Sequence, residues 1–285
     1  MYVVMGANGK TGGAVARILL DRELPVRVVL RPGRSGEEWK RLGAEAVHAD
    51  VRDAEALTRA FAGARAAYVL NPPDYAADDM LASARAVAGA YATAIAASGT
   101  RAVALSSIGA QHAQGTGNIV TTHVLERALA PVGASFVRAG NFMTNWLPAL
   151  PAVREGVLPS FFTPLDRPVP HVAVADIATT VVRELERGDS RTVELAAAAD
   201  YSPDDVAAAC AGALGRPVAA QAVERGRWHR AHADMGLPPA AIGNWLEMWE
   251  GFNSGHIRFE NTPERGRTTL EDFVGAAVAR ADADR

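Results

Sequence analysis

The chain has 285 residues, 49% of them apolar, which is enough to bury the core of one large α/β domain or of two unequal lobes. Its 29 basic and 32 acidic side chains leave a net charge of −3, which offers no electrostatic footprint for nucleic acid. No basic leader and no run of about 18 apolar residues is visible, so we expect a cytoplasmic protein with no membrane partner.

Short β-branched segments alternate with Ala-rich helical stretches through the first half of the chain, a pattern typical of βαβ units and a parallel sheet. The sequence therefore predicts an α/β fold with a Rossmann-type, doubly wound parallel sheet. The expected strands are 2–5, 26–30, 46–49, 66–70, 101–105 and 135–137, and the expected helices lie near 11–22, 54–62, 78–98 and 119–130.

The amino-acid composition of the sequence changes after Asn141. Six prolines punctuate residues 148–170 and exclude long helices from that stretch. A helix is then expected from Val174, with Asp176 placed to favour the dipole at its N-terminus. A strand over 192–196 should return to the sheet.

These signals divide the chain into two parts. We predict an N-terminal Rossmann domain over residues 1–155, to which 174–197 return, and a smaller, mostly helical lobe over 156–285. In this lobe, Ser202 followed by Pro203 is typical of a helix start. A later helix has one strongly apolar face, most simply explained by core packing, which carries Trp245, Met248, Trp249 and Phe252.

A glycine-rich turn, Gly-Ala-Asn-Gly-Lys-Thr-Gly at residues 6–12, lies between the first strand and the first helix. A pyrophosphate group binds where backbone N–H groups point outward at a helix N-terminus, and glycines let the main chain approach it without a clash from Cβ. The flanking strand and helix supply the context that this motif requires. The sequence therefore predicts a dinucleotide site whose turn residues are Gly6, Asn8, Gly9, Lys10, Thr11 and Gly12.

The residue at the end of the second strand selects the dinucleotide. An acidic side chain there accepts hydrogen bonds from the ribose hydroxyls of NAD, whereas an arginine pairs with the additional phosphate of NADP. This chain has Arg31 there, helped by Arg34, so we expect NADP(H); the alternative is that Arg31 is a solvated loop residue. Further cofactor contacts are expected from Asp50 and Val51 beside the adenine, and from Asn71, Pro72 and Pro73 beside the ribose.

Several segments spread over almost the whole chain resemble the NmrA-like family of atypical short-chain dehydrogenases/reductases. They are residues 6–12, Arg31, 71–73, 106–107, 138–142, 174–178 and 253–256. Members of this family include NAD(P)H-dependent quinone and azo reductases, and also regulators that bind the dinucleotide without turnover, so the resemblance leaves catalysis open. It also implies that Gly140, Asn141 and Phe142 lie beside the nicotinamide.

The proton donor of the usual short-chain reductase is absent from this chain. That donor is a Tyr four residues before a Lys, which lowers the pKa of the tyrosine. The only lysines here are Lys10 and Lys40, and neither follows a Tyr at this spacing. The proton donor must therefore be another group, or the substrate must need no proton from the protein. A quinone is such a substrate, because its reduced anion takes a proton from water.

Other side chains are candidates for chemistry. His123 lies where the Tyr and Lys would stand and can donate a proton near neutral pH; a helix-surface or core histidine is the alternative. The end of the fifth strand and the end of the sixth should meet at the sheet edge where such folds bind ligands. We assign Ser106 to the cofactor, His123, Ser107 and Asn141 to catalysis, and Phe142, Trp146 and Phe162 to an apolar substrate pocket or, alternatively, to the core.

The histidines predict no metal site. The nearest approach is His229 with His232, and the absence of a cysteine or acidic companion at ligand spacing is typical of packed or solvated histidines.

Two functions from different classes stay open. The first is an NADPH-dependent reductase that transfers a hydride to a small aromatic or quinone-like molecule. The second is a non-catalytic NADP(H)-binding redox sensor that acts through a protein partner, which the absent Tyr and Lys favour. An epimerase or dehydratase that uses bound NAD(P) transiently fits less well, because such relatives generally retain that pair.

Overall fold

In the computed structural model, which describes residues 1–72, 74–77 and 79–283, the chain forms two compact units. We refer to them as the first unit, Met1–Ala113, Ile119–Arg138 and Ile177–Val193, and the second unit, Gln114–Asn118, Ala139–Asp176 and Glu194–Arg285. Residues 177–193, which hold most of the helix that begins at Val174, thus lie in the first unit, and residues 139–155 lie in the second.

An eight-stranded sheet runs in the order β3-β2-β1-β4-β5-β6-β10-β13. The pairs β1–β2, β2–β3, β1–β4, β4–β5 and β10–β13 are parallel, which confirms the predicted doubly wound sheet. The direction of winding reverses between β1 and β4, and folds of this kind bind ligands at the carboxyl ends of the strands beside such a reversal. The strands are β1 (Tyr2–Met5), β2 (Val26–Leu30), β3 (Glu45–His48), β4 (Ala66–Leu70), β5 (Arg101–Ser107), β6 (Ser135–Ala139), β10 (Thr192–Ala196) and β13 (Glu264–Arg265).

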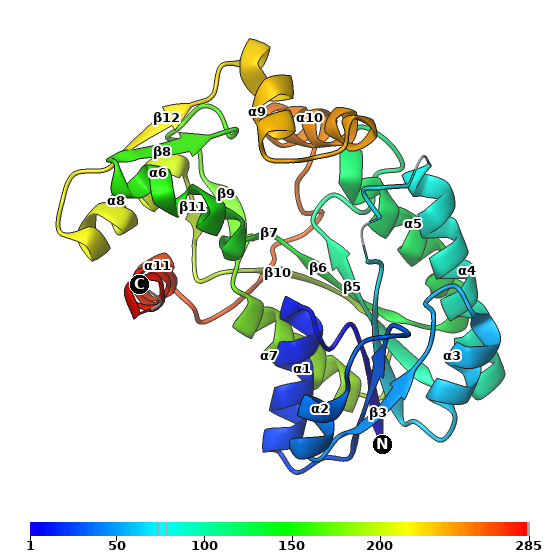
Figure 1. The fold of residues 1–285 in the computed structure, drawn as a ribbon. Helices are drawn as coiled ribbons and strands as arrows, with labels where there is room; N and C mark the ends of the chain where they lie inside the picture. The colour runs from blue at the N-terminus through cyan, green and yellow to red at the C-terminus, as the bar shows by residue number, and fades with distance from the viewer. Residues whose placement is uncertain (73, 78, 284–285) are drawn as a thin grey trace. The chain divides into compact units, whose positions relative to one another are not determined.

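Helices cover both faces of the sheet in the first unit (Figure 1). The helices α1 (Lys10–Asp21), α2 (Glu37–Arg41) and α7 (Val174–Glu186) lie on one face, and α3 (Ala54–Phe61), α4 (Met80–Ser98) and α5 (Val120–Leu129) on the other. The apolar stripes of α3, α4 and α5 pack on alternate side chains of the strands and form one continuous core. Burial of this apolar surface is the main contribution to the stability of the folded first unit.

Helix α4 is long and apolar enough to cross a membrane by length and composition alone. Its Val87, Tyr91 and Ile95 are nevertheless buried in the core of the first unit. Asp79 caps the helix by accepting a hydrogen bond from the N–H of Ala82, and Gly99 ends it in a left-handed conformation. It is therefore a core helix of the α/β fold.

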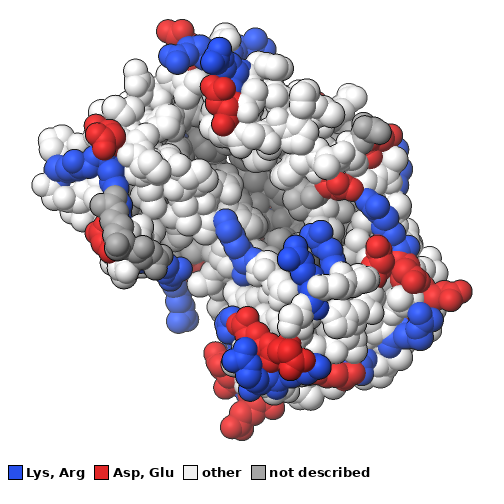
Figure 2. All heavy atoms as spheres, in the orientation of Figure 1, with Lys and Arg blue, Asp and Glu red and all other residues white. Residues whose placement is uncertain are grey.

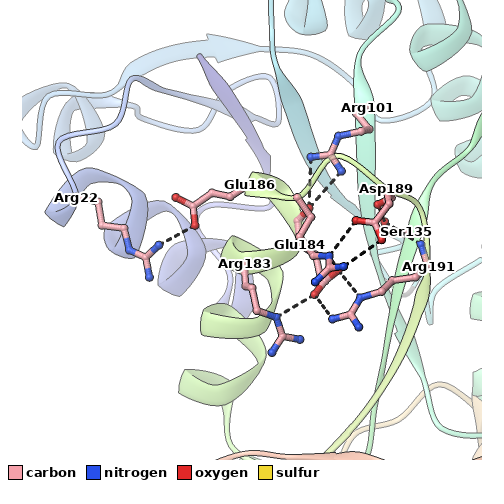
Figure 3. Close-up of polar contacts among 9 residues, drawn as sticks. Arg22, Arg101, Ser135, Arg183, Glu184, Glu186, Asp189 and Arg191 are labelled. Carbon is pink, nitrogen blue, oxygen red and sulfur yellow. Dashed lines mark hydrogen bonds and ion pairs between the residues drawn. The ribbon is translucent and has the colours of Figure 1, made fainter.

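The carboxyl end of α7 is held by arginines (Figure 3). Arg101, at the start of β5, donates to the carbonyl oxygens of Glu184 at 3.2 Å and Leu185 at 2.6 Å. The carboxylate of Glu184, whose side chain is fully buried, accepts hydrogen bonds from Arg183 and Arg191. The last carbonyls of a helix have no partner within it and carry the negative end of its dipole, so these cations stabilise the end of α7.

The second unit has five helices among its described residues, in keeping with the expected mostly helical lobe, and also two small sheets. One has the order β11-β9-β7 and the other pairs β12 with β8. These strands are two to four residues long, too short for an alternating pattern to be visible. The elements are β7 (Asn141–Phe142), α6 (Leu150–Arg154), β8 (Val157–Ser160), β9 (Val169–Val172), β11 (Asp200–Tyr201), α8 (Pro203–Leu214), β12 (Ala219–Ala222), α9 (Trp228–Asp234), α10 (Pro239–Ser254) and α11 (Leu270–Ala283).

Several local predictions are confirmed. The strands expected at 2–5, 26–30, 66–70 and 192–196 have these bounds in the structure. Ser202 starts α8 with a capping box, in which it accepts from the N–H of Asp205 and the Asp205 carboxylate accepts from the N–H of Ser202. Asp176 lies in the first turn of α7, but its carboxylate accepts the N–H groups of Arg267 and Thr268. Acidic and basic side chains are interspersed on the face shown in Figure 2, in keeping with the balanced composition.

Candidate functional site

A cavity of about 400 Å³ lies in the first unit at the carboxyl ends of β1, β2, β3 and β4. This is the sheet edge at which the strand order reverses. Its walls combine the glycine-rich turn, the end of β2 and apolar side chains. The lining residues are Met5, Gly6, Ala7, Asn8, Gly9, Val29, Leu30, Arg31, Arg34, Ala49, Val51, Leu70, Pro72 and Tyr91.

The glycines of the turn are required by the geometry of the backbone. Gly6 has a φ of +65°, which favours glycine, and its carbonyl oxygen accepts the N–H of Gly9 at 2.8 Å. A Cβ on Gly12 would collide with the carbonyl oxygen of Gly6 and lie 2.5 Å from that of Met5, so only glycine lets α1 pack this closely on β1. Among the described residues no side chain caps α1, and the first N–H groups of a helix have no partner within it, so this end suits an anion.

The polar side chains of the turn differ in their surroundings. The Oδ1 atom of Asn8 accepts a hydrogen bond from the indole N–H of Trp39 at 2.9 Å. The buried hydroxyl of Thr11 accepts one from Tyr68 at 2.9 Å, so Thr11 anchors the start of α1 to β4. Lys10 is exposed at the first position of α1. The turn thus presents mainly backbone groups and one cation.

Arg31 and Arg34 lie on the cavity wall at the end of β2. Both are exposed, and neither guanidinium has an ion-pair or hydrogen-bond partner within the part of the chain that the structure describes. The N–H of Arg34 donates to the carbonyl oxygen of Arg31 at 3.1 Å, which forms a turn carrying both side chains. Two unpaired guanidinium groups at one wall are suited to a phosphate, which they can bind through parallel hydrogen bonds.

The expected residues after β3 and β4 lie at the same edge. Ala49 and Val51 line the cavity on either side of Asp50, whose carboxylate accepts the N–H of Arg52 at 2.8 Å. Pro72 lines the cavity, and the side-chain oxygen of Asn71 is buried without a hydrogen-bond partner among the described residues. Pro73, which we also expected at the ribose, lies outside the described residues.

Sequence reasoning missed Tyr91 and Trp39. Tyr91 on α4 lines the cavity and donates from its hydroxyl to the carbonyl oxygen of Leu70 at 3.2 Å, which fixes the end of β4. Trp39 is 2% exposed although α2 has only five residues. A lone tryptophan between two acidic and two basic residues is the signal that would have revealed a short helix with one buried face.

The candidate residues after β5 belong to a buried polar network in the first unit. Ser106 donates from its hydroxyl to Glu126 at 2.6 Å, and Arg138 donates to both carboxylate oxygens of Glu126 at 2.9 and 2.8 Å. Ser106, Glu126 and Arg138 are each at most 8% exposed, so this ion pair ties β5, α5 and β6 together. The hydroxyl proton of Ser106 is therefore used within the protein.

His123 and Ser107 are half-buried near the same strand end. The Nδ1 atom of His123 lies 2.9 Å from the carbonyl oxygen of Ala110, in the segment that follows β5. The hydroxyl of Ser107 donates to the carbonyl oxygen of Ile108 at 3.1 Å. Both side chains are therefore oriented by the backbone after β5.

The predicted nicotinamide segment, Gly140, Asn141 and Phe142, lies in the second unit. A Cβ on Gly140 would lie 2.7 Å from the carbonyl oxygen of Pro170, so glycine permits the close pairing with β9. The Oδ1 atom of Asn141 accepts from Asn145 at 2.9 Å, while its Nδ2 is buried with no hydrogen-bond partner among the described residues. Asn141 therefore holds an unused donor, which a carbonyl oxygen of a ligand would satisfy.

The aromatic residues of the second unit form a connected cluster. Trp146 and Phe162 have ring centroids 5.9 Å apart, and the indole N–H of Trp146 donates to Nε2 of His171 at 3.0 Å. Phe162 is 3% exposed and belongs to the core. Phe142 is half-buried and lies outside the ring contacts of this cluster. The structure thus brings two of the three expected pocket rings together.

The two histidines nearest to metal-ligand spacing have different environments. His229 is exposed, whereas His232 is buried. The Nδ1 atom of His232 donates to the carbonyl oxygen of Trp228 at 2.7 Å, and its Nε2 accepts the indole N–H of Trp249 at 2.9 Å. Within the described ranges no group of three or more His, Cys, Asp or Glu is arranged to hold a metal ion.

Comparison with known proteins identifies the family. The sequence profile of the NmrA-like family matches residues 2–254. The chain belongs to the NmrA-like family. This match spans the glycine-rich turn, the strand-end arginine and the Asn141 segment, so one family accounts for both the fold and the segments that resemble it.

Among NmrA-like relatives, the chain is similar to the NAD(P)H azoreductase of Xenophilus azovorans, with 26% identity over 257 residues that cover 87% of this chain and 86% of the azoreductase. The NADPH-dependent quinone oxidoreductase of Escherichia coli, solved with NADPH, superposes with a TM-score of 0.79 at 22% identity and covers 98% of this chain and 100% of its own. Nmra, a negative transcriptional regulator, superposes with a TM-score of 0.76 at 16% identity over 99% of this chain and 97% of its own. This NmrA-like fold therefore occurs in an enzyme and in a regulator.

Proposed function

We propose that the first unit binds NADP(H) in the cavity at the carboxyl ends of β1–β4. The observation that carries this proposal is the pair Arg31 and Arg34. Both line the cavity, neither guanidinium has a partner among the described residues, and no acidic residue belongs to the described lining. An acidic side chain at this wall would favour NAD by accepting the ribose hydroxyls, and two guanidinium groups favour the 2′-phosphate of NADP. The residues present fit the group: the described cavity lining carries two arginines and no acidic residue, and the N-terminus of α1 is uncapped by any described side chain.

In this proposal each segment has a role in binding. The backbone of Gly9–Gly12 and the side chains of Asn8, Lys10 and Thr11 hold or flank the pyrophosphate. Arg31 binds the 2′-phosphate, Asp50 and Val51 flank the adenine, and Asn71 with Pro72 flanks the ribose. Toward the nicotinamide end we assign Ser106, Gly140, Asn141 and Phe142.

We further propose that the protein is a reductase of a small aromatic or quinone-like molecule. When bound, the reduced nicotinamide supplies a hydride. The names of the azoreductase and quinone oxidoreductase relatives support this substrate class. Quinone reduction also suits a chain without the Tyr and Lys pair, because the hydroquinone anion formed by hydride transfer takes its proton from water.

The chain's own contribution is then mainly orientation. The unpartnered Nδ2 of Asn141 donates to a carbonyl oxygen at the nicotinamide end, and Ser107 and His123 provide polar groups beside the strand edge. The rings of Phe142 and Trp146 provide an apolar wall that excludes water from a flat substrate, and the core residue Phe162 packs against Trp146. Holding two reactants at reacting distance supplies several kcal/mol without any acid.

The second candidate is a sensor that binds NADP(H) and alters its affinity for a protein partner. The specific observation in its favour is the missing Tyr and Lys pair, and the fold is also that of the regulator Nmra. The test is to mix the protein with NADPH and a panel of quinones, azo dyes, aldehydes and enones and to follow the loss of NADPH absorbance. Turnover of a quinone supports the reductase; binding of NADPH with no turnover of any compound in the panel favours the sensor.

A further inference from the structure

The loop that carries Arg31 and Arg34 leaves the sheet beside His48. In the register of β2 and β3, Leu30 pairs with His48, so Arg31 is the first residue beyond that pair. Gly33 has a φ of +81°, which lets the chain turn so that both arginines reach the cavity. The contacts that fix the backbone of this turn therefore determine the positions of the two guanidinium groups on the cavity wall.

His48 holds the backbone of Arg34. Its Nε2 lies 2.7 Å from the carbonyl oxygen of Arg34, and because a carbonyl only accepts, Nε2 carries the proton and donates it. The side chain of His48 is exposed and ends β3, so a rigid strand anchors this hydrogen bond. His48 thereby limits the movement of Arg34 relative to the sheet.

The helix after the loop is fixed against the sheet at its first residue. A Cβ on Gly36, the N-cap of α2, would lie 2.7 Å from Cβ of Ala46 and 3.3 Å from Cδ1 of Leu30. The loop of six residues between Leu30 and α2 is therefore held at both ends.

Trp39 connects this helix to the pyrophosphate turn. It is 2% exposed, and its indole N–H donates to Oδ1 of Asn8 at 2.9 Å. The guanidinium of Arg17 lies over the indole ring, 5.2 Å from its centroid, and pairs with Glu38 at 2.8 Å. One buried side chain thus joins the helix after the arginine loop to the pyrophosphate turn.

We propose that His48 and Trp39 are positioning residues of the dinucleotide site. His48 sets the preference for a dinucleotide with a 2′-phosphate by holding Arg34. Trp39 sets the affinity for dinucleotides with and without the 2′-phosphate alike, by holding Asn8 in the pyrophosphate turn. Each acts through the residue that it holds. The inference rests on the proposed binding of NADP(H).

The role of His48 is tested by titrating NADPH and NADH into the wild type, His48→Ala and His48→Gln. We expect His48→Ala to weaken NADPH binding by roughly three- to tenfold, the effect of one hydrogen bond, and to leave NADH binding unchanged. His48→Gln retains an N–H donor and should recover most of the loss. His229→Ala, which removes an exposed histidine of α9, is the matched control and should change neither affinity.

The role of Trp39 is tested by a double-mutant cycle with Asn8. Trp39→Phe keeps an aromatic ring in the core, and Asn8→Ala removes the acceptor without altering the core. We expect Trp39→Phe to weaken NADPH and NADH binding equally, by roughly three- to tenfold. In the Asn8→Ala variant, the same substitution should cause no further loss of affinity. Thermal unfolding of each variant verifies that the fold is intact. Additive losses in the double variant would overturn the role of Trp39.

The results separate this inference from the proposed function. A wild type that binds NADPH and NADH equally would overturn both the NADP(H) assignment and the role of His48. A wild type that prefers NADPH, together with a His48→Ala variant that keeps the full preference, would overturn the role of His48 alone.

Discussion

The Nδ1 atom of His123 donates to the carbonyl oxygen of Ala110 across 2.9 Å, which fixes the proton of the neutral ring on Nδ1. Nε2 then carries a lone pair and gains a proton only in the imidazolium form. His123 can therefore act as an acid from Nε2 only when the ring carries protons on both nitrogens.

The first prediction separates positioning from acid catalysis. His123→Ala should leave quinone reduction nearly intact and lower the kcat/KM for an aldehyde or enone by roughly 10²- to 10⁴-fold, because only the second class takes a proton from the protein. Asn141→Ala and Phe142→Ala should impair both classes. Steady-state kinetics with NADPH measure this. If His123→Ala abolishes quinone reduction while NADPH affinity is unchanged, the positioning mechanism is wrong and His123 is the acid.

The second prediction concerns Arg31. Arg31→Ala should weaken NADPH binding by about 1–3 kcal/mol and leave NADH binding nearly unchanged, because only NADPH carries the 2′-phosphate. Calorimetric titration of both cofactors into the wild type and the variant measures it. Arg59→Ala removes an exposed cation of α3 outside the cavity lining and serves for comparison. Equal losses for both cofactors in Arg31→Ala would place the 2′-phosphate elsewhere.

The third prediction distinguishes two glycines of the turn. A Cβ on Gly9 would lie 3.2 Å from the carbonyl oxygen of Gly6, which allows folding, whereas a Cβ on Gly12 would collide with backbone. Gly9→Val should therefore retain a native circular dichroism spectrum and lose NADPH binding, and Gly12→Val should lose the fold. Normal NADPH binding by Gly9→Val would show that this turn is not the phosphate site.

The fourth prediction concerns the buried carboxylate of α7. Burial raises the pKa of Glu184, but hydrogen bonds from Arg191 and Arg183 lower it more, so the net pKa is lowered. The charged form therefore stabilises the fold at neutral pH, and this stability is lost as pH falls below the ordinary range of a glutamate. Glu184→Gln should reduce the free energy of unfolding by about 2–3 kcal/mol at neutral pH.

The control for this prediction is Glu186→Gln, which breaks an exposed ion pair with Arg22 (Figure 3). It should cost less than about 1 kcal/mol, because solvent screens that pair. Urea unfolding at neutral and acid pH measures both variants. A Glu184→Gln variant as stable as Glu186→Gln would contradict the assignment of Glu184 as a buried charge.

The fifth prediction concerns His171. Complete burial lowers its pKa to about 4, and its Nε2 accepts the indole N–H of Trp146, so the folded protein holds it neutral. The unfolded chain takes up a proton near the ordinary pKa of histidine while the folded chain does not, so stability falls as pH decreases from that value toward the folded pKa. From this residue we expect a loss of about 2 kcal/mol between about pH 7 and about pH 5.

Urea unfolding of the wild type and of His171→Phe at those two pH values measures this contribution. The variant has a lower stability at neutral pH, because Trp146 loses its acceptor, but a smaller change with pH. An equal pH dependence in the two proteins would show that His171 is not the titrating group.

Sequence patterns determined the elements whose causes lie close together along the chain. The strands of the first unit, the capping box at Ser202 and the glycine-rich turn each depend on neighbouring residues, through side-chain alternation, a local hydrogen bond or a permitted backbone angle. The consecutive βαβ pattern then leaves few arrangements other than a doubly wound sheet, whose carboxyl edge is the ligand edge. The prediction of a dinucleotide site at residues 6–12 rests on these local rules.

Tertiary structure alone decided which distant side chains meet. Asn8 and Trp39 are 31 residues apart, and Ser106 and Glu126 are 20 apart. Their pairing depends on the register of strands and the rotation of helices, neither of which has a signature in the residues themselves. The two-residue strands of the second unit are stabilised by the partners they find and not by their own propensity, so they become visible only when the chain is folded.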